Sequence, residues 1–167
     1  WGNKMDITKL PDFLEIRSIL ESVGKLAKDN NQRITSHPGP FSLLASPKQE
    51  VISNSIQDLE LHSTVYDLLG LEESPYNKIN IHLGATYGNK EMAVNNWITN
   101  FKKLSSACQK RLTIENDDKQ SMFSVKELYD MVYQKIGIPI VFDVHHHKFC
   151  TGDLSEEEAL KLAIKTW

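Results

Sequence analysis

The sequence predicts an α/β protein in which short parallel strands alternate with helices. Segments rich in β-branched residues are followed by segments whose apolar residues recur at helical spacing. The predicted strands end roughly 30 to 45 residues apart, which suits consecutive right-handed βα units. The last of them, at 138–144, is almost entirely apolar, which is typical of a strand buried on both faces.

Each predicted element has a signal of its own. The expected strands cover 33–37, 78–84, 111–115 and 138–144. The expected helices cover 11–29, 48–69, 89–107, 124–136 and the segment from 155 to the last residue. The first helix has an inward apolar stripe made of Phe13, Ile16, Leu20, Val23 and Ala27. Capping boxes at Ser124 and Ser155 open the last two helices.

Four βα units amount to half of an eight-stranded barrel, which typically needs about 250 residues. We therefore predict a TIM-type (β/α) barrel of which this chain, residues 1–167 taken as a single domain, supplies about half. An open doubly wound sheet is the rival arrangement. The two differ in where the polar residues lie, since a barrel gathers the ends of its strands at one mouth.

The composition is ordinary for a globular protein, with 40% hydrophobic and 25% charged residues. A net charge of −3 argues mildly against a nucleic-acid partner, although bound divalent ions would reverse the local charge. Cys108 and Cys150 form no CxxC motif, so neither a disulfide framework nor a zinc knuckle is expected. With no apolar run near 18 residues and no signal peptide pattern, we expect an intracellular protein without a membrane partner.

All four predicted strands finish on a potential metal ligand, namely His37, His82, Glu115 and Asp143. A single histidine at a strand end is more often structural. When all four strands end on a potential ligand, however, a shared site at one mouth of the barrel is predicted. Imidazole together with carboxylate fits Zn, Mn or Fe rather than Ca or Mg.

The string Asp143-Val144-His145-His146-His147 strengthens this prediction. Asp143 and His146 are three residues apart and can reach adjacent ions of one cluster. A run of three histidines alone would indicate a solvated loop. Because this run follows a buried strand that ends in aspartate, a built metal site is favoured.

Four strings in the sequence resemble the UV-damage DNA endonuclease family, namely SHPG (36–39), IHLGATYGNK (81–90), LTIENDDK (112–119) and PIVFDVHHH (139–147). They occur in the order and spacing of that family, which is similar in barrel architecture to endonuclease IV and the xylose-isomerase-like enzymes. The resemblance covers nearly the whole chain, and it implies that the chain is roughly the central half of the barrel.

The resemblance implies a set of site residues. The implied metal ligands are His37, His82, Glu115, Asp143 and His146, and Glu115 would bridge two ions. Glu115, His82 and Asp143 would form the catalytic centre, whereas Asn116, His145 and His147 would support the ligands or face solvent. Two or three divalent ions are implied for a complete enzyme, with manganese the first choice and zinc the alternative.

The implied reaction is metal-dependent hydrolysis of a phosphodiester on the 5′ side of UV photoproducts in double-stranded DNA, by a monomer. Candidate DNA contacts are Pro40, Phe41, Tyr87, Lys90 and Lys119, although surface or loop-packing roles are open for all of them except Pro40. In the family, Gln-Tyr usually follows His-Pro-Gly. Phe41 keeps an aromatic wedge here, but Pro40 loses the hydrogen bonds of an amide, so damage recognition is expected to be looser.

Three other functions are open at this point. They are an abasic-site endonuclease of the endonuclease IV type, a xylose-isomerase-like sugar isomerase or epimerase, and a catalytically inactive damaged-DNA-binding fragment. The resemblance also implies further ligands outside this chain, including a histidine pair, a glutamate and a lysine that can be carboxylated. We therefore expect the chain alone to retain metal weakly and to lack nuclease activity.

Overall fold

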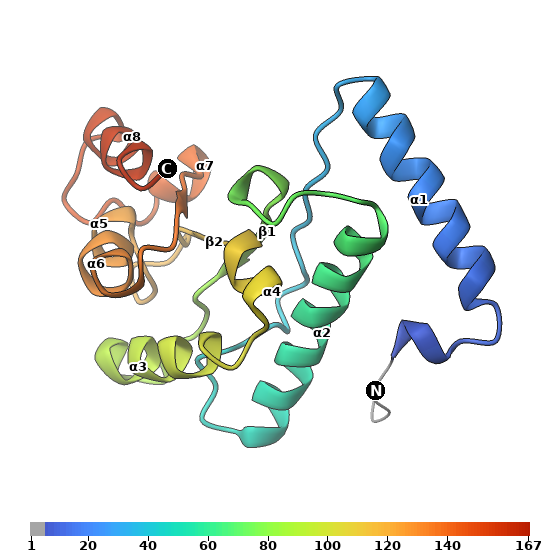
Figure 1. The fold of residues 1–167 in the computed structure, drawn as a ribbon. Helices are drawn as coiled ribbons and strands as arrows, with labels where there is room; N and C mark the ends of the chain where they lie inside the picture. Colours follow the sequence, from blue (N-terminus) through green and yellow to red (C-terminus); the bar gives the residue numbers. More distant parts are fainter. Residues whose placement is uncertain (1–5) are drawn as a thin grey trace.

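The computed structural model describes residues 6–167 and contains a parallel three-stranded sheet flanked by helices (Figure 1). The strands are β1 (Ile79–His82), β2 (Leu112–Glu115) and β3 (Ile140–Val141), and they lie in the order β1-β2-β3. His82 is opposite Glu115, and Glu115 is opposite Val141. This register places the ends of β1 and β2 at the same level.

The helices follow the strands in the expected alternation. The longer ones are α1 (Phe13–Asp29), α2 (Gln49–Leu68), α3 (Lys90–Phe101) and α8 (Glu156–Ile164). The shorter ones are α4 (Ser106–Arg111), α5 (Val125–Leu128), α6 (Gln134–Ile136) and α7 (Val144–His147). Within residues 6–167, none of them combines the length and the apolar character that a membrane span needs.

The two faces of the sheet differ in chemistry. Alternate strand positions hold apolar side chains that are at most 2% exposed, namely Ile79, Ile81, Leu112, Ile114 and Ile140. These residues share one core with apolar residues of α2, α3, α5 and α8. The other positions of β1 and β2 hold Asn80, His82, Thr113 and Glu115, so the opposite face is polar. Because a doubly wound sheet covers both faces with helices, this polar face favours the barrel.

All four predicted strands are shorter than expected, and the first and the last are shortened most. The strand at 33–37 is reduced to a single bridge, in which Ser36 pairs with Ile79 in parallel. Pro38 follows without a backbone N–H, so the pairing cannot continue. The strand at 138–144 is reduced to β3, because the Asn116 side chain takes over the hydrogen bonds of the Asp143 backbone. Asp143 therefore caps α7 instead of ending a strand.

Three predicted helices also differ from expectation. The helix at 89–107 divides into α3 and α4, because Ser105 accepts the N–H of Cys108 and starts a new helix. The helix at 124–136 is interrupted by a π-helical turn at Tyr129–Tyr133 that separates α5 from α6. The last helix ends at Ile164, before the chain does. Both predicted capping boxes are present, at Ser124 and Ser155.

The apolar stripe predicted for α1 faces inward except at Val23, since Ala27 is buried and Phe13, Ile16 and Leu20 are half-buried. Only Gly24 and Ala27 of this helix are buried, whereas Val23 is 44% exposed. The helix lies on the outer side of α2, away from the sheet (Figure 1). It contacts the end of α2 through Gly24, where an added Cβ would lie 1.8 Å from the carbonyl oxygen of Leu69. Because Gly24 has no Cβ, α1 can pack closely against the end of α2.

Candidate metal centre

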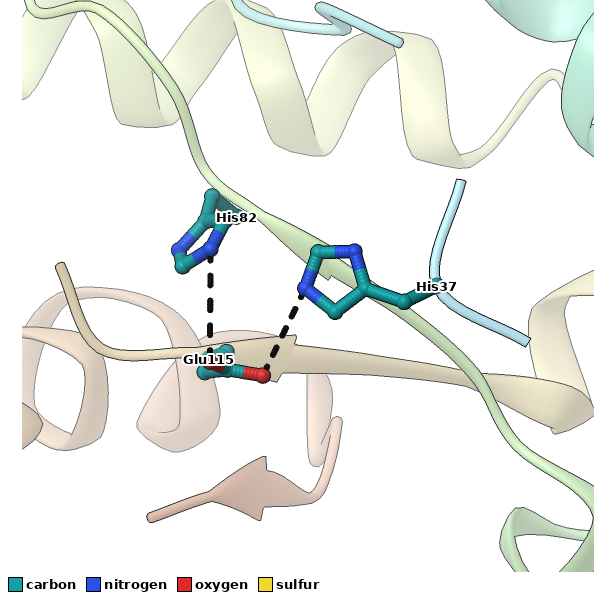
Figure 2. A group of neighbouring side chains, drawn as sticks. All are labelled: His37, His82 and Glu115. Carbon is teal, nitrogen blue, oxygen red and sulfur yellow. Dashed lines mark ion pairs between the residues drawn. The ribbon is translucent and has the colours of Figure 1, made fainter. Parts of the chain in front are cut away.

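The side chains predicted at the strand ends gather around Glu115 (Figure 2). His37 Nε2 is 3.6 Å from Glu115 Oε2, and His82 Nε2 is 4.0 Å from Glu115 Oε1. From the other side, His146 Nδ1 is 3.5 Å from Glu115 Oε1 and 4.0 Å from Asp143 Oδ2. The predicted gathering of these residues at one rim is confirmed.

Parallel pairing explains this convergence. His82 and Glu115 are the last residues of β1 and β2 and lie opposite each other in the register. His37 follows the bridged residue Ser36, and its Nδ1 lies 3.1 Å from the carbonyl oxygen of Pro38. That contact turns Nε2 of His37 toward Glu115. Asp143 and His146 come from the first turn of α7, just beyond β3.

The residues form two groups suited to divalent metal ions. One group is His37, His82 and Glu115, the other is Glu115, Asp143 and His146, and within each group the ligand atoms lie within 4.8 Å of one another. Ligand atoms bonded at about 2.1 Å to one ion are separated by at most about 4.2 Å. Small side-chain movements would therefore suffice to close either group on an ion. Glu115 belongs to both groups, as a bridging carboxylate would.

Burial and neighbouring charges together shift the pKa values of ionisable residues in this site. Glu115 is 6% exposed and faces three imidazoles. Burial lowers the pKa of His82, but the Asp117 carboxylate and then Glu115 outweigh it, so this pKa is raised. Burial raises the pKa of Asp143, but the backbone N–H and the charge of His146 outweigh it and lower this pKa. The negative charge of the same carboxylates would also attract a bound cation.

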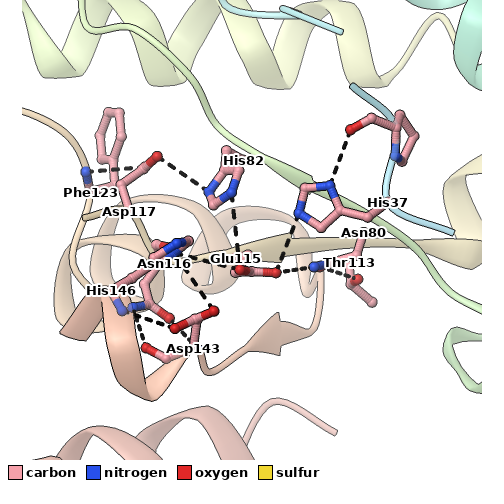
Figure 3. Close-up of polar contacts among 11 residues, drawn as sticks. His37, Asn80, His82, Thr113, Glu115, Asn116, Asp117, Phe123, Asp143 and His146 are labelled. Atoms are coloured by element: carbon pink, nitrogen blue, oxygen red, sulfur yellow. Dashed lines mark hydrogen bonds and ion pairs between the residues drawn. The ribbon is translucent and has the colours of Figure 1, made fainter. Parts of the chain in front are cut away.

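Supporting residues hold the ligands in place (Figure 3). The Asn116 amide donates to the carbonyl of Asp143 at 3.0 Å and accepts its N–H at 2.8 Å. The carbonyl oxygen of Asn116 lies 2.8 Å from His146 Nδ1. Asp117 is 3% exposed, and its Oδ1 lies 3.3 Å from His82 Nδ1, although the two are not aligned as a hydrogen bond.

Comparisons with known proteins agree with this geometry. Residues 8–167 match the family described as UV-endonuclease UvdE. The chain belongs to the UvdE family. It is 39% identical over 155 residues to a UV DNA damage endonuclease of Clostridium perfringens (strain 13 / Type A), covering 92% of this chain and 36% of that relative. A Bacillus cereus (strain G9842) relative of the same description is 40% identical over 145 residues, covering 87% of this chain and 44% of the relative.

Solved structures support the same fold. The crystal structure of SacUVDE superposes with a TM-score of 0.84 at 40% identity and covers 92% of this chain and 50% of that chain. D-psicose 3-epimerase from Clostridium cellulolyticum H10 shares the fold, with a TM-score of 0.65 at 15% identity. This UvdE-family chain therefore has a partial TIM-barrel fold, and it spans less than half the length of the curated relatives it matches.

The other two histidines of α7 lie apart from both groups in this UvdE-family chain. The exposed ring of His145 packs edge-on against Phe149, with centroids 5.3 Å apart. His147 is buried against Phe142, at a centroid distance of 5.4 Å. Their predicted roles as support or solvent-facing residues stay predictions.

The predicted DNA contacts differ in their exposure and in whether they are paired within the protein. Phe41 is 84% exposed, and Tyr87 is 42% exposed on a backbone with positive φ. Lys119 is exposed. Lys90, by contrast, is held in an ion pair with Glu127 of α5 at 2.5 Å, so it is not free to meet a phosphate in this arrangement.

A cleft of about 580 Å³ opens beside the first metal group. His37, His82 and Asp117 lie on its polar side, and Pro40 lies among its apolar lining. The sequence analysis did not single out this cleft, since residues from four separate segments line it.

Sequence reasoning also missed Asn80 and Thr113. Asn80 donates a hydrogen bond to Glu115 Oε2 and accepts one from Thr113. Strand periodicity could have found both, since Asn80 is two residues before His82 and Thr113 two before Glu115. Polar residues at alternate positions of otherwise apolar strands were the available signal.

Proposed function

We propose that this chain supplies the metal centre of a DNA endonuclease that cleaves on the 5′ side of UV photoproducts in double-stranded DNA, in excision repair inside the cell. The observation that carries the proposal is the central position of Glu115 between two ligand groups, in a chain whose relatives are named UV DNA damage endonucleases. Those names do not favour a sugar isomerase or a repair protein without catalysis.

The residues of this chain divide the work of binding. His37 and His82 would hold one divalent ion, Asp143 and His146 would hold a second, and Glu115 would contribute to both sites. Manganese is the preferred ion and zinc the alternative. Bound ions of this kind lower the pKa of a water nucleophile and neutralise charge that develops on the phosphate.

The surroundings of the metal centre suit a DNA strand. Phe41 stands out from the loop after His37, where an aromatic ring can enter a base step. Tyr87 and Lys119 are exposed beyond the ends of β1 and β2 and can contact the phosphate backbone of the DNA. We assign Lys90 a role in folding, because Glu127 neutralises it.

The proposal is tested by placing this chain in a complete enzyme. The chain replaces the matching segment of the Clostridium perfringens relative, and the purified chimera is incubated with supercoiled plasmid and Mn²⁺. We expect it to nick UV-irradiated plasmid in preference to unirradiated plasmid, and to cut an oligonucleotide with one pyrimidine dimer on the 5′ side of the dimer.

The matched control is the same chimera with Glu115→Gln, which should not nick either plasmid. A plasmid with abasic sites distinguishes the endonuclease IV type of activity. A folded, metal-loaded chimera that nicks irradiated and unirradiated plasmid equally would refute the proposed function.

A further inference from the structure

Three polar side chains form a hydrogen-bonded row beneath the metal centre (Figure 3). The Thr113 hydroxyl donates to Asn80 Oδ1 at 2.8 Å. The Asn80 amide nitrogen in turn donates to Glu115 Oε2. The row therefore runs from β2 to β1 and back to β2.

All three side chains are removed from water. Thr113 is 0% exposed, Asn80 is 4% exposed and Glu115 is 6% exposed. Asparagine is disfavoured in strands, and a buried amide is costly unless its hydrogen bonds are made. Asn80 makes hydrogen bonds at both ends of its amide. The Glu115 carboxylate only accepts, so the amide nitrogen faces it, and the Thr113 hydroxyl anchors the other end by donating to Oδ1.

The contact with Glu115 orients the carboxylate. With Asn80 on Oε2, that oxygen faces His37, and Oε1 faces His82 and His146. Each carboxylate oxygen has more than one lone pair, so Oε2 can accept from Asn80 and still bind an ion. Oε2 therefore faces the first group, and Oε1 lies between the two groups. A carboxylate free to rotate would move Oε1 out of this shared position.

We propose that Asn80, anchored by Thr113, is a positioning residue that holds the Glu115 carboxylate between the two metal groups. This inference rests on the proposed metal centre and adds two residues to it. Asn80 and Thr113 do not touch the ions and act through Glu115.

Titration of the chimera described above with Mn²⁺, followed by the electron paramagnetic resonance signal of the free ion, tests this role. Asn80→Leu has similar volume and removes both hydrogen bonds, so we expect Mn²⁺ affinity to fall by about 10- to 100-fold, as for other residues that orient ligands. Thr113→Val should lower the affinity less, whereas Thr113→Ser keeps the hydroxyl and should bind as the unsubstituted chimera does.

The double variant Asn80→Leu with Thr113→Val provides a further test. If Thr113 acts through Asn80, the double variant binds Mn²⁺ no more weakly than Asn80→Leu alone. Additive losses of Mn²⁺ affinity would mean that Thr113 does not act through Asn80, and would overturn its proposed role.

Asn100 supplies the matched control. It is also buried, at 3% exposure, and its amide donates to the carbonyl of Leu44 at 2.8 Å on the far side of the core in α3. Asn100→Leu should lower thermal stability and leave Mn²⁺ affinity unchanged. Equal losses of affinity in Asn100→Leu and Asn80→Leu would reduce the effect to general destabilisation and overturn the proposal.

The failures are distinguishable. A folded chimera that binds neither Mn²⁺ nor Zn²⁺ at millimolar concentration overturns the proposed metal centre, and this inference with it. A chimera that binds Mn²⁺ with the same affinity in every folded variant overturns only the role of Asn80. If Asn80→Leu fails to fold, as judged by circular dichroism, the comparison of Thr113→Val with Thr113→Ser decides the outcome.

Discussion

Glu115 combines burial with three imidazole neighbours, whereas the surface glutamates of the chain are solvated. A buried carboxylate in such surroundings is a weak contributor to stability and a strong ligand for cations. Lys90, which lies beyond the end of β1, contrasts with Glu115 because a single opposite charge neutralises it. Lys90 is paired with Glu127, so its charge is already neutralised by a partner within the protein. At this scale, the partner of each charged group decides its role.

Replacing Glu115 by Gln should separate binding from folding. We expect Mn²⁺ affinity to fall by more than about 100-fold, beyond the loss typical of residues that merely orient ligands. The metal-free variant should unfold at the same temperature as the unsubstituted chain or higher, since a buried charge is removed. Isothermal titration and a thermal melt measure the two quantities, with exposed Glu156→Gln as the control.

Glu127 should give a pH-dependent contribution to stability. Burial raises its pKa, but hydrogen bonds from Lys90 and Ser124 outweigh burial and lower the pKa below 4.5. The contribution is therefore present above about pH 4.5 and is lost as the pH falls through the folded-state pKa. At pH 7, Glu127→Gln should lower the free energy of unfolding by about 1 to 2 kcal/mol.

Urea unfolding of Glu127→Gln and of the unsubstituted chain at pH 7 and at pH 3 measures this difference. The two proteins should converge at the lower pH, and Lys90→Met should show only the part due to the ion pair. A difference of the same size at both pH values would exclude the ionised carboxylate as its cause.

At the scale of elements, local signals set where most helices begin, but contacts with other elements set where they end. Ser105 starts α4 with its own cap and is also bound by Glu60 of α2, so the predicted helix at 89–107 divides there. Arg111 at the end of α4 is fully buried and hydrogen bonded to Ser63 and Asp67 of α2. These contacts join α2 to the start of β2 and thereby support Glu115.

Gly24→Ala should reverse the usual effect of this substitution in a helix. Alanine normally stabilises a helix interior by about 1 kcal/mol relative to glycine. Here the added Cβ would lie 1.8 Å from the Leu69 carbonyl oxygen, so α1 must move away from α2. We expect a net loss of about 1 to 3 kcal/mol in the free energy of unfolding, as for other overpacked sites.

Denaturant unfolding measures the effect of Gly24→Ala. Ser22→Ala on the exposed side of the same helix is the control and should be neutral or slightly stabilising. If Gly24→Ala stabilised the protein by the usual amount, the close approach of α1 to α2 would be ruled out.

At the scale of the molecule, metal and fold should be thermodynamically linked. The ligands come from the segment around His37, from β1, from β2 and from α7, so two ions sharing Glu115 would together tie four separate segments. At a free Mn²⁺ concentration 100 times the dissociation constant, stability should rise by about 2.7 kcal/mol.

The rise is measured as an increase in melting temperature with Mn²⁺ that a chelator reverses. Glu115→Gln should remove most of it. A melting temperature that does not respond to saturating Mn²⁺, when titration shows binding, would mean that the ion binds the unfolded chain equally well.

The sequence by itself determined the alternation of strands and helices, the capping boxes and the residues that meet at the rim. It could do so because hydrophobic period, cap spacing and the position of a residue at the end of a strand are local properties. The meeting of His82 and Glu115 follows from the parallel pairing of β1 and β2, whereas His37 follows a single bridge and Asp143 caps α7 just beyond β3.

Only the tertiary structure decided how Glu115 is oriented, which charges are neutralised and how α1 packs. Asn80 reaches Glu115 because β1 and β2 pair in one register, and Lys90 meets Glu127 because α5 packs near α3. These contacts join residues that are more than 30 positions apart in the chain. Local patterns contain no information about such partners, since register and packing are settled only when the elements come together.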